Sequence, residues 1–313
     1  RKKPFIQNLF YLGSSYGFGF FLSNLHWIVY SMTFDETFRI FIPFGLFLIP
    51  VFLSLFFSLP IVISGYFVDD RISSVFLISL FFGLSDFLRS IIFTGFPWNL
   101  WVYSLSFSIE NLQLLYSLGF FSLNLVVITL YFLPAAMFFK NINKYIVLGI
   151  LIIISLSNYF YGSYVINTKS DFNQLERKVN FKIVSAGLNL YEFTDPIDVT
   201  KKLIKFSEPD KEKSTIFVWP EGTFMSENFL SSKKINKIRQ LFKKNFSDNH
   251  FIILGLNTVK KNNSQKNYYN SMILVNNNLD IISQYDKKKL VPFGEFLPFE
   301  NVLNKIGMKK ITP

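Results

Sequence analysis

The sequence predicts a polytopic α-helical membrane domain over residues 1–166, followed by an α/β domain over residues 167–313. Of the 313 residues, 50% are hydrophobic and only 17% are charged, whereas charged residues make up about 25% of an average soluble domain. The charges are also unevenly divided. Residues 1–166 hold 8 Lys/Arg and 6 Asp/Glu, whereas residues 167–313 hold 24 Lys/Arg and 15 Asp/Glu. We therefore expect the chain to pass from lipid to water near residue 166.

Five apolar runs in the first domain are each long enough for a helix that crosses the roughly 30 Å hydrocarbon core of a bilayer. The first run is too long for a signal peptide and has no small-residue cleavage site. We therefore expect about five transmembrane helices, at residues 9–32, 40–66, 74–94, 112–139 and 145–165.

The basic residues of the short loops predict how these helices are oriented, because cytoplasmic loops are enriched in Lys and Arg. One set of helix ends has Arg1, Lys2, Lys3, Arg71, Lys140 and Lys144, and the other set has only Arg39 and Arg89. This predicts a cytoplasmic N-terminus and, after five crossings, an α/β domain on the opposite side. The aromatic loop at residues 95–101 falls on that outer side, either as a functional interfacial segment or as an ordinary belt of aromatic residues.

The second domain alternates β-rich runs with amphipathic stretches, as α/β domains do. The strand candidates are Phe181–Ala186, Thr215–Trp219, Phe251–Asn257, Ser271–Asn276 and Ile281–Tyr285. Helices are expected at about 197–207 and 228–245, and the polar stretch Lys260–Asn267 is expected to be a loop or a hairpin connection.

Two segments of this domain carry candidate chemistry. Strand Thr215–Val218 runs into Trp-Pro-Glu-Gly, where Pro220 ends the strand and Glu221 is presented at its carboxyl end, the edge where α/β sheets usually place functional groups. The segment Tyr285–Phe299 also leaves a strand and passes from three lysines into a loop rich in Pro, Phe and Gly. Taken alone, Glu221 is also compatible with a surface charge, and the lysines with a solvated charge run.

Together the two segments resemble the nitrilase (carbon–nitrogen hydrolase) superfamily, whose pattern has Trp-Pro-Glu after one strand and Tyr-x-Lys-x-x-Leu with a Pro-Phe-Gly-Glu continuation. Joined to the membrane helices, they make the whole chain similar to the apolipoprotein N-acyltransferase family of the bacterial inner membrane. Further segments that match are Gly17–Phe21, His26–Trp27, Phe87–Arg89, Thr94–Trp98 and Tyr269–Ser271.

This resemblance implies a nitrilase-like α-β-β-α sandwich on the periplasmic side of the inner membrane. It implies transfer of an acyl chain from a glycerophospholipid to the N-terminal α-amine of a diacylglyceryl-cysteine apolipoprotein, through a thioester acyl-enzyme. The implied catalytic residues are Glu221 as general base, Lys287 as oxyanion partner and Glu295 as the partner of Lys287. No cofactor or metal is implied. The substrate-binding candidates are Trp98, Asn270, Phe293 and Gly294.

The sequence departs from the family pattern in two ways. The family has eight transmembrane helices and a nucleophilic cysteine, whereas this chain resembles the family from its third helix to a point before that cysteine, and it holds no cysteine. We therefore expect a fragment that is inactive by itself, with a pseudoenzyme as the alternative. The family's Gln-x-Asn appears here as Gly187-Leu188-Asn189, which leaves the role of Asn189 open.

Other functional classes are disfavoured by the composition. Without cysteine there is no disulfide and no thiolate zinc site, and with two histidines a Ser-His-Asp triad is disfavoured. The lysines of the second domain are spread without a nucleic-acid-binding motif. A transporter is disfavoured because Asp86, Arg89 and Glu110 lie near the predicted outer helix ends. A membrane-tethered amidase and a non-catalytic membrane binding protein stay open as alternatives.

Overall fold

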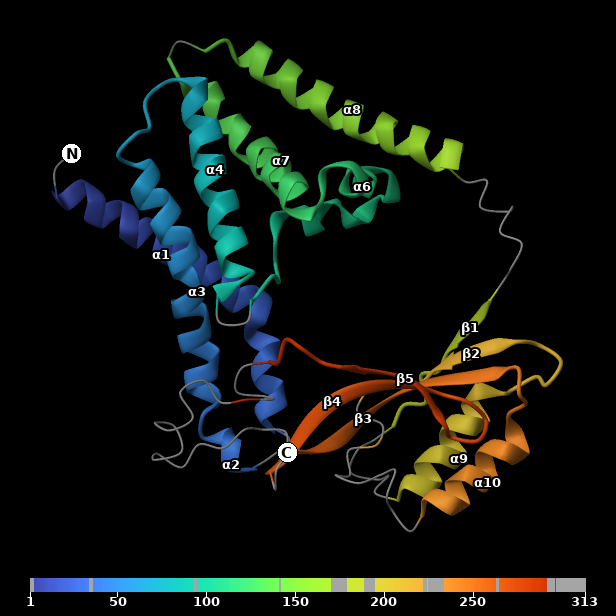
Figure 1. The fold of residues 1–313 in the computed structure, drawn as a ribbon. Coiled ribbons are helices and arrows are strands. Elements are labelled where there is room, and N and C mark those ends of the chain that lie inside the picture. The colour runs from blue at the N-terminus through green and yellow to red at the C-terminus, as the bar shows by residue number, and fades with distance from the viewer. Residues whose placement is uncertain are drawn as a thin grey trace. The chain divides into compact units, whose positions relative to one another are not determined.

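The chain divides into two compact units, residues Arg1–Asn173 and Gln174–Pro313, which are described separately (Figure 1). This computed structural model describes residues 3–33, 36–92, 95–140, 142–169, 179–188, 195–221, 224, 234–262, 265–291 and 296.

The secondary-structure elements of the first unit are all helices in its described residues. Four of its helices are long and apolar enough to cross a membrane: Ile42–Ser64, Ile72–Arg89, Phe120–Phe138 and Lys144–Thr168. The elements are α1 (Lys3–Leu25), η1 (His26–Thr33), α2 (Glu36–Arg39), α3 (Ile42–Ser64), α4 (Ile72–Arg89), η3 (Trp101–Phe107), α5 (Ile109–Leu112), α6 (Leu114–Leu118), α7 (Phe120–Phe132), η4 (Leu133–Phe138) and α8 (Lys144–Lys169).

The first predicted crossing corresponds to α1, which is not among these four helices. Its 23 residues would span about 34 Å at 1.5 Å per residue, but it carries polar residues such as Asn8 and Ser15. It packs closely along α3, because its glycines Gly13 and Gly17 approach the α3 backbone at Ser58 and Ser54. The reversed order of these contacts shows that the two helices are antiparallel. That α1 is a fifth crossing stays a prediction.

The predicted run 112–139 is interrupted in the structure. Gly119 has a φ of +77°, a left-handed conformation that favours glycine, and it separates α6 from α7. The helix that can span the membrane therefore begins at Phe120.

The second unit is a five-stranded mixed sheet with the strand order β1-β2-β3-β4-β5. The strands are β1 (Asn180–Ile183), β2 (Thr215–Val218), β3 (His250–Asn262), β4 (Gln265–Val275) and β5 (Ile281–Asp286). Strands β1, β2 and β3 are parallel, whereas β3, β4 and β5 form an antiparallel meander. The expected connection at 260–267 is a hairpin, whose strands are paired as far as Asn262 and Gln265.

Two amphipathic helices, α9 (Pro196–Ser207) and α10 (Ile235–Asn245), cover one face of the sheet (Figure 1). Their apolar residues, among them Leu203 and Phe242, form one core with alternate residues of the strands, among them Phe217. Burial of this apolar surface is the main stabilising contribution to the unit. The described part of α10 begins at Ile235, and residues 228–233 of the predicted helix lie outside the described residues.

The opposite face of the sheet exposes large apolar side chains. Phe181 and Ile183 of β1 are 62% and 80% exposed, and Met272 of β4 and its cross-strand neighbour Tyr285 of β5 are both more than half exposed. Side chains alternate between the two faces of a strand, so these residues lie opposite the helix-covered core. Among its described residues, the unit therefore has one covered apolar face and one open apolar face.

Candidate active site

Glu221 lies on a turn that is attached to the sheet on both sides. Before it, the Trp219 amide donates to the Ile253 carbonyl at 2.9 Å, and the buried Trp219 indole N–H donates to Ser207 Oγ at 3.0 Å. After it, Phe224 forms a bridge with Leu256 of β3. Pro220 has no N–H with which to continue the ladder. Glu221 is thereby presented to solvent at the carboxyl end of β2, with a side chain that is 73% exposed.

Asn270 and Lys287 are placed beside each other by the antiparallel ladder between β4 and β5. Ser271 pairs with Asp286 in that ladder, so Asn270 and Lys287 are the next pair along. Their main chains are joined, because the Lys287 amide donates to the Asn270 carbonyl at 2.8 Å. The pairing of β4 with β5 therefore places the Lys287 side chain next to the amide side chain of Asn270.

The three side chains meet at one carboxylate oxygen. Asn270 Nδ2 donates to Glu221 Oε1 at 3.3 Å, and Lys287 Nζ lies 3.8 Å from the same oxygen. Asn270 and Glu221 are 49 residues apart in the sequence. Because Glu221 is largely exposed and Lys287 is 34% exposed, solvent screens this ion pair and it contributes little to stability. The contact is important because it places a carboxylate base, Glu221, next to a cation, Lys287.

A second layer of polar contacts lies behind this group, on the β3-β4-β5 meander. The buried Ser271 hydroxyl donates to Asp286 Oδ1 at 2.7 Å, and Gln284 Nε2 donates to the same oxygen at 2.7 Å. Ser271 Oγ also lies 2.6 Å from Thr258 Oγ1. Sequence reasoning missed Ser271 and Asp286 as supporting residues, although each directly adjoins a predicted site residue.

The chemical capacity of the group follows from its members. A carboxylate can accept a proton from a nucleophile, and an ammonium can stabilise the negative charge that develops on a carbonyl oxygen. Lys288 and Lys289 are exposed, so Lys287 is the lysine of this run that turns toward Glu221. Within the described ranges, no group of three His, Asp or Glu side chains is arranged to hold a metal ion.

The remaining predicted residues are not among the described residues of the α/β unit. Trp98 belongs to the helical unit, where its indole stacks on Trp27 with ring centroids 5.5 Å apart. The predicted residues Phe293, Gly294, Glu295 and Asn189 lie outside the described residues.

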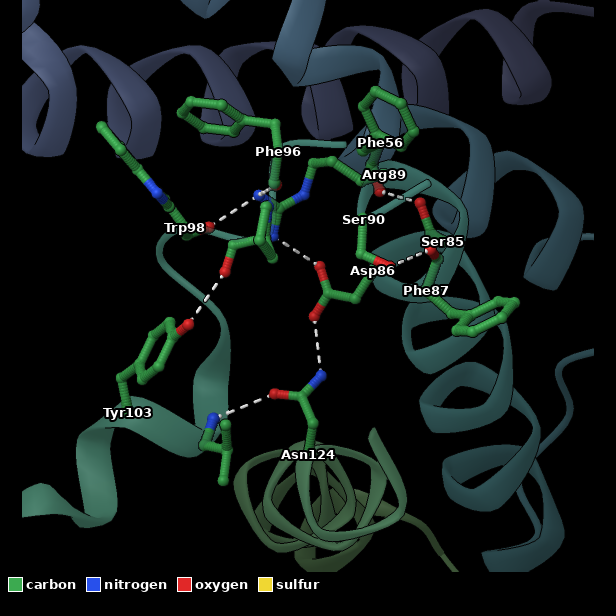
Figure 2. A network of polar contacts seen from close by, with 12 residues as sticks. Phe56, Ser85, Asp86, Phe87, Arg89, Ser90, Phe96, Trp98, Tyr103 and Asn124 are labelled. Atoms are coloured by element: carbon green, nitrogen blue, oxygen red, sulfur yellow. Dashed lines mark hydrogen bonds and ion pairs between the residues drawn. The ribbon is translucent and has the colours of Figure 1, made fainter. Parts of the chain in front are cut away.

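The helical unit holds a buried charged network of its own (Figure 2). Arg89 is 2% exposed and Asp86 is 5% exposed, and both lie near the end of α4, as the sequence predicted. Arg89 Nη2 donates to Asp86 Oδ1 at 2.9 Å. Both residues lie in the last turn of α4, but neighbouring elements cover them, so they are enclosed rather than exposed at the surface.

Comparison with known proteins identifies similar chains. Residues 1–133 match the family described as the apolipoprotein N-acyltransferase N-terminal domain. Curated relatives named apolipoprotein N-acyltransferase include those of Rhodopseudomonas palustris, 26% identical over 95% of this chain and 58% of the relative, and of Allorhizobium ampelinum, 24% identical over 98% of this chain and 58% of the relative. The relative from Rickettsia prowazekii is 28% identical over 96% of this chain and 59% of its own length.

This chain is therefore similar to apolipoprotein N-acyltransferases along nearly all of its residues, and it spans a little under three fifths of their length. The similarity extends beyond the residues that match the N-terminal family and into the unit that holds Glu221 and Lys287.

Proposed function

We propose that this chain forms the membrane unit and part of the catalytic unit of an enzyme that N-acylates apolipoproteins. The acyl donor is a glycerophospholipid, and the acceptor is the N-terminal α-amine of a diacylglyceryl-cysteine apolipoprotein. The observation that carries the proposal is the convergence of Glu221, Asn270 and Lys287 on one carboxylate oxygen. The names of the similar proteins support the class of reaction.

The proposed mechanism has two steps and needs a thiol. Glu221 accepts the thiol proton, the thiolate attacks the ester carbonyl of the phospholipid, and the lysophospholipid leaves with that proton. The α-amine then attacks the thioester, Glu221 accepts the amine proton, and the thiol is released. Lys287 stabilises the tetrahedral oxyanion in both steps, an effect of about 10²–10³ for one donor. Asn270 orients Glu221 through its hydrogen bond to Oε1.

The thiol has to come from outside these 313 residues, which contain no cysteine. The chain alone should therefore form no covalent acyl adduct when it is incubated with phospholipid. Turnover by these residues alone would mean that another nucleophile operates.

We also propose that the α/β unit is one half of a nitrilase-like α-β-β-α sandwich. The support is the open face of the sheet, where Phe181, Ile183 and Met272 expose apolar surface. Exposed apolar patches of this kind usually mark an interface. A second sheet packed on this face would give the unit two sheets between two helical layers.

The proposed location is the inner membrane, with the α/β unit in the periplasm. This orientation requires that α1 crosses the membrane together with the four helices that are long and apolar enough to do so. A reporter that is active only outside the cytoplasm should be active when fused after Pro313 and silent when fused at Asn141. The reverse pattern would refute this orientation and, with it, a periplasmic site.

The site itself is tested by two lysine variants in the complete open reading frame that encodes this chain. Lys287→Met should abolish or severely slow N-acylation, because it removes the cation but keeps the aliphatic stem. Lys288→Met is the matched control and should be nearly silent, because exposed substitutions usually change stability by no more than about 0.5 kcal/mol. Full activity of Lys287→Met in a folded, membrane-inserted protein would refute the assignment.

A variant of the carboxylate separates its role from that of the lysine. Glu221→Gln keeps the shape of the side chain but removes the base, so the thioester should form slowly or not at all in a trapping assay. Rapid thioester formation by Glu221→Gln would show that another group takes the proton. Release of free fatty acid without any N-acylated product would instead favour a hydrolase.

A further inference from the structure

The loop that carries Trp98 is attached to the helical unit by an enclosed cation. Arg89 Nη1 donates to the Phe96 carbonyl at 2.8 Å and to the Trp98 carbonyl at 2.7 Å. Its second terminal nitrogen, Nη2, donates to Asp86 Oδ1 at 2.9 Å. Figure 2 shows the guanidinium between the loop and the carboxylate. One side chain thus binds two main-chain carbonyls of the loop and one acid of α4.

The same acid connects the loop to a second helix. Asp86 Oδ2 accepts a hydrogen bond from Asn124 Nδ2 of α7 at 2.9 Å. Asn124 Oδ1 in turn accepts from the Val102 amide, just after the loop, at 2.9 Å. The loop is therefore held at its start by Arg89 and at its end by Asn124, with Asp86 joining the two (Figure 2).

The geometry of these bonds depends on a guanidinium. Arg89 satisfies three acceptors at once, because its donors diverge in a fixed plane. A lysine ammonium is a single point and cannot reproduce that fork. Burying a charged group inside a membrane unit costs free energy, and such groups are usually functional. Because the buried Arg89 binds main-chain carbonyls of the loop, we infer that the conformation of the loop is important.

The fixed loop directs two indole rings. Trp98 stacks on Trp27 with an interplanar angle of 18°, and Phe96 lies beside Trp98 with ring centroids 5.2 Å apart. The Trp27 N–H donates to the Asn24 carbonyl, so its polar end is satisfied within the protein. Both indoles nevertheless remain about half exposed. Together they form a flat aromatic surface on the helical unit.

We propose that Arg89 is a positioning residue, which orients Trp98 against Trp27 so that the stacked pair receives the acyl chain of a phospholipid. The function of the pair rests on the proposed acyl transfer, whereas the positioning by Arg89 does not. The apolar faces of stacked indoles suit a hydrocarbon chain, and tryptophan favours the depth at which acyl chains meet headgroups.

The positioning is tested by the exciton signal of the stacked indoles in circular dichroism. The 313-residue chain in nanodiscs should show an exciton couplet, a pair of bands of opposite sign, from the stacked Trp27 and Trp98. The couplet should disappear in Trp27→Phe, which removes one of the two indoles. Arg89→Lys should reduce the couplet amplitude to less than about half, because the fork to the two carbonyls is lost. Asp86→Asn keeps the volume of the side chain but removes the charge that orients Arg89, and it should also reduce the couplet.

The control is Phe82→Leu, a buried change in the same helix that leaves the Arg89 contacts in place and should keep the couplet. If Arg89→Lys and Asp86→Asn are both inserted and both keep the full couplet, the positioning role is refuted. Equal loss in Phe82→Leu would also refute it, because the couplet would then report only general packing.

The ligand is tested separately with phospholipids brominated on the acyl chain. These lipids should quench the tryptophan fluorescence of the wild type much more than that of Trp98→Phe. In the Arg89→Lys background, the quenching that Trp98 contributes should be smaller. Absence of quenching at Trp98 would refute the acyl-chain contact but not the positioning. Absence of N-acylation in the complete protein would refute the proposed function. It would not affect the circular dichroism result, so the positioning role of Arg89 would still stand.

Discussion

The packing of α1 on α3 makes a prediction that can be worked out from three glycines of one helix. A Cβ at Gly13 would lie 2.6 Å from Ser58 Cα, and a Cβ at Gly17 would lie 2.9 Å from Ser54 Cα. A Cβ at Gly19 would meet nothing within 4 Å. Alanine at the first two positions therefore forces the helices apart, whereas alanine at Gly19 does not.

The expected energies follow from two opposing contributions. Alanine is favoured over glycine inside a helix by about 1 kcal/mol, and this gain applies to all three positions. Overpacking costs about 1–3 kcal/mol, and it applies only to Gly13 and Gly17. Separation of the helices also weakens the contact between the Ser14 and Ser58 hydroxyls, which are 2.8 Å apart, and an interhelical hydrogen bond of this kind contributes about 0.6 kcal/mol.

The assay is unfolding by sodium dodecyl sulfate in mixed micelles, followed by far-UV circular dichroism. Gly19→Ala should be neutral or more stable than the wild type, whereas Gly13→Ala should be less stable than Gly19→Ala by about 1–3 kcal/mol. Because both variants gain the same helix propensity, their difference measures the packing alone. Equal stability of the two variants would refute the close approach of α1 and α3.

Two further predictions concern the α/β unit. Hydrogen bonding from the Ile197 amide, and then from Lys234, lowers the pKa of Asp195 below its ordinary value of 3.8, so this carboxylate stabilises the fold above about pH 4 and loses that effect as the pH falls through its folded pKa. The difference in melting temperature between the wild type and Asp195→Ala should therefore be present at neutral pH and decrease as the pH falls through the folded pKa, and a constant difference would contradict the shift. Trp219→Phe removes the N–H that Ser207 accepts and should cost about 1 kcal/mol or more in denaturant unfolding; an unchanged midpoint would contradict that bond.

The sequence indicated the ends of the strands next to Glu221 and Lys287, but not the contacts that support these residues. The strand candidates Thr215–Trp219 and Ile281–Tyr285 end within one residue of β2 and β5, and Lys287 Nζ lies 3.8 Å from Glu221 Oε1. The pairing of Asn270 with Lys287 depends on the register of β4 and β5. Composition and alternation do not specify that register, so the contacts of Ser271 with Asp286 could not be anticipated.

In the helical unit, hydropathy identified the long apolar segments but not their interruptions. Gly119 breaks a run whose composition is uniformly apolar, because its backbone conformation depends on the local turn and not on hydropathy. Asp86 and Arg89 were expected near a helix end, and they lie in the last turn of α4. Their burial arises from the contacts with Asn124 and with the loop carbonyls, which are tertiary and leave no periodic pattern in the sequence.

The long hairpin of β3 and β4 has a consequence for which changes of chain length the site can tolerate. Glu221 is attached to β3 on both sides, through Trp219 and Phe224, whereas Lys287 is attached to β4. A deletion of one residue within either hairpin strand would shift β4 by about 3.4 Å along β3 and turn its side chains to the opposite face. The carboxylate and the ammonium would then no longer meet. Within this hairpin, length changes that keep the site should therefore be tolerated only between Asn262 and Gln265, outside the paired residues of the two strands.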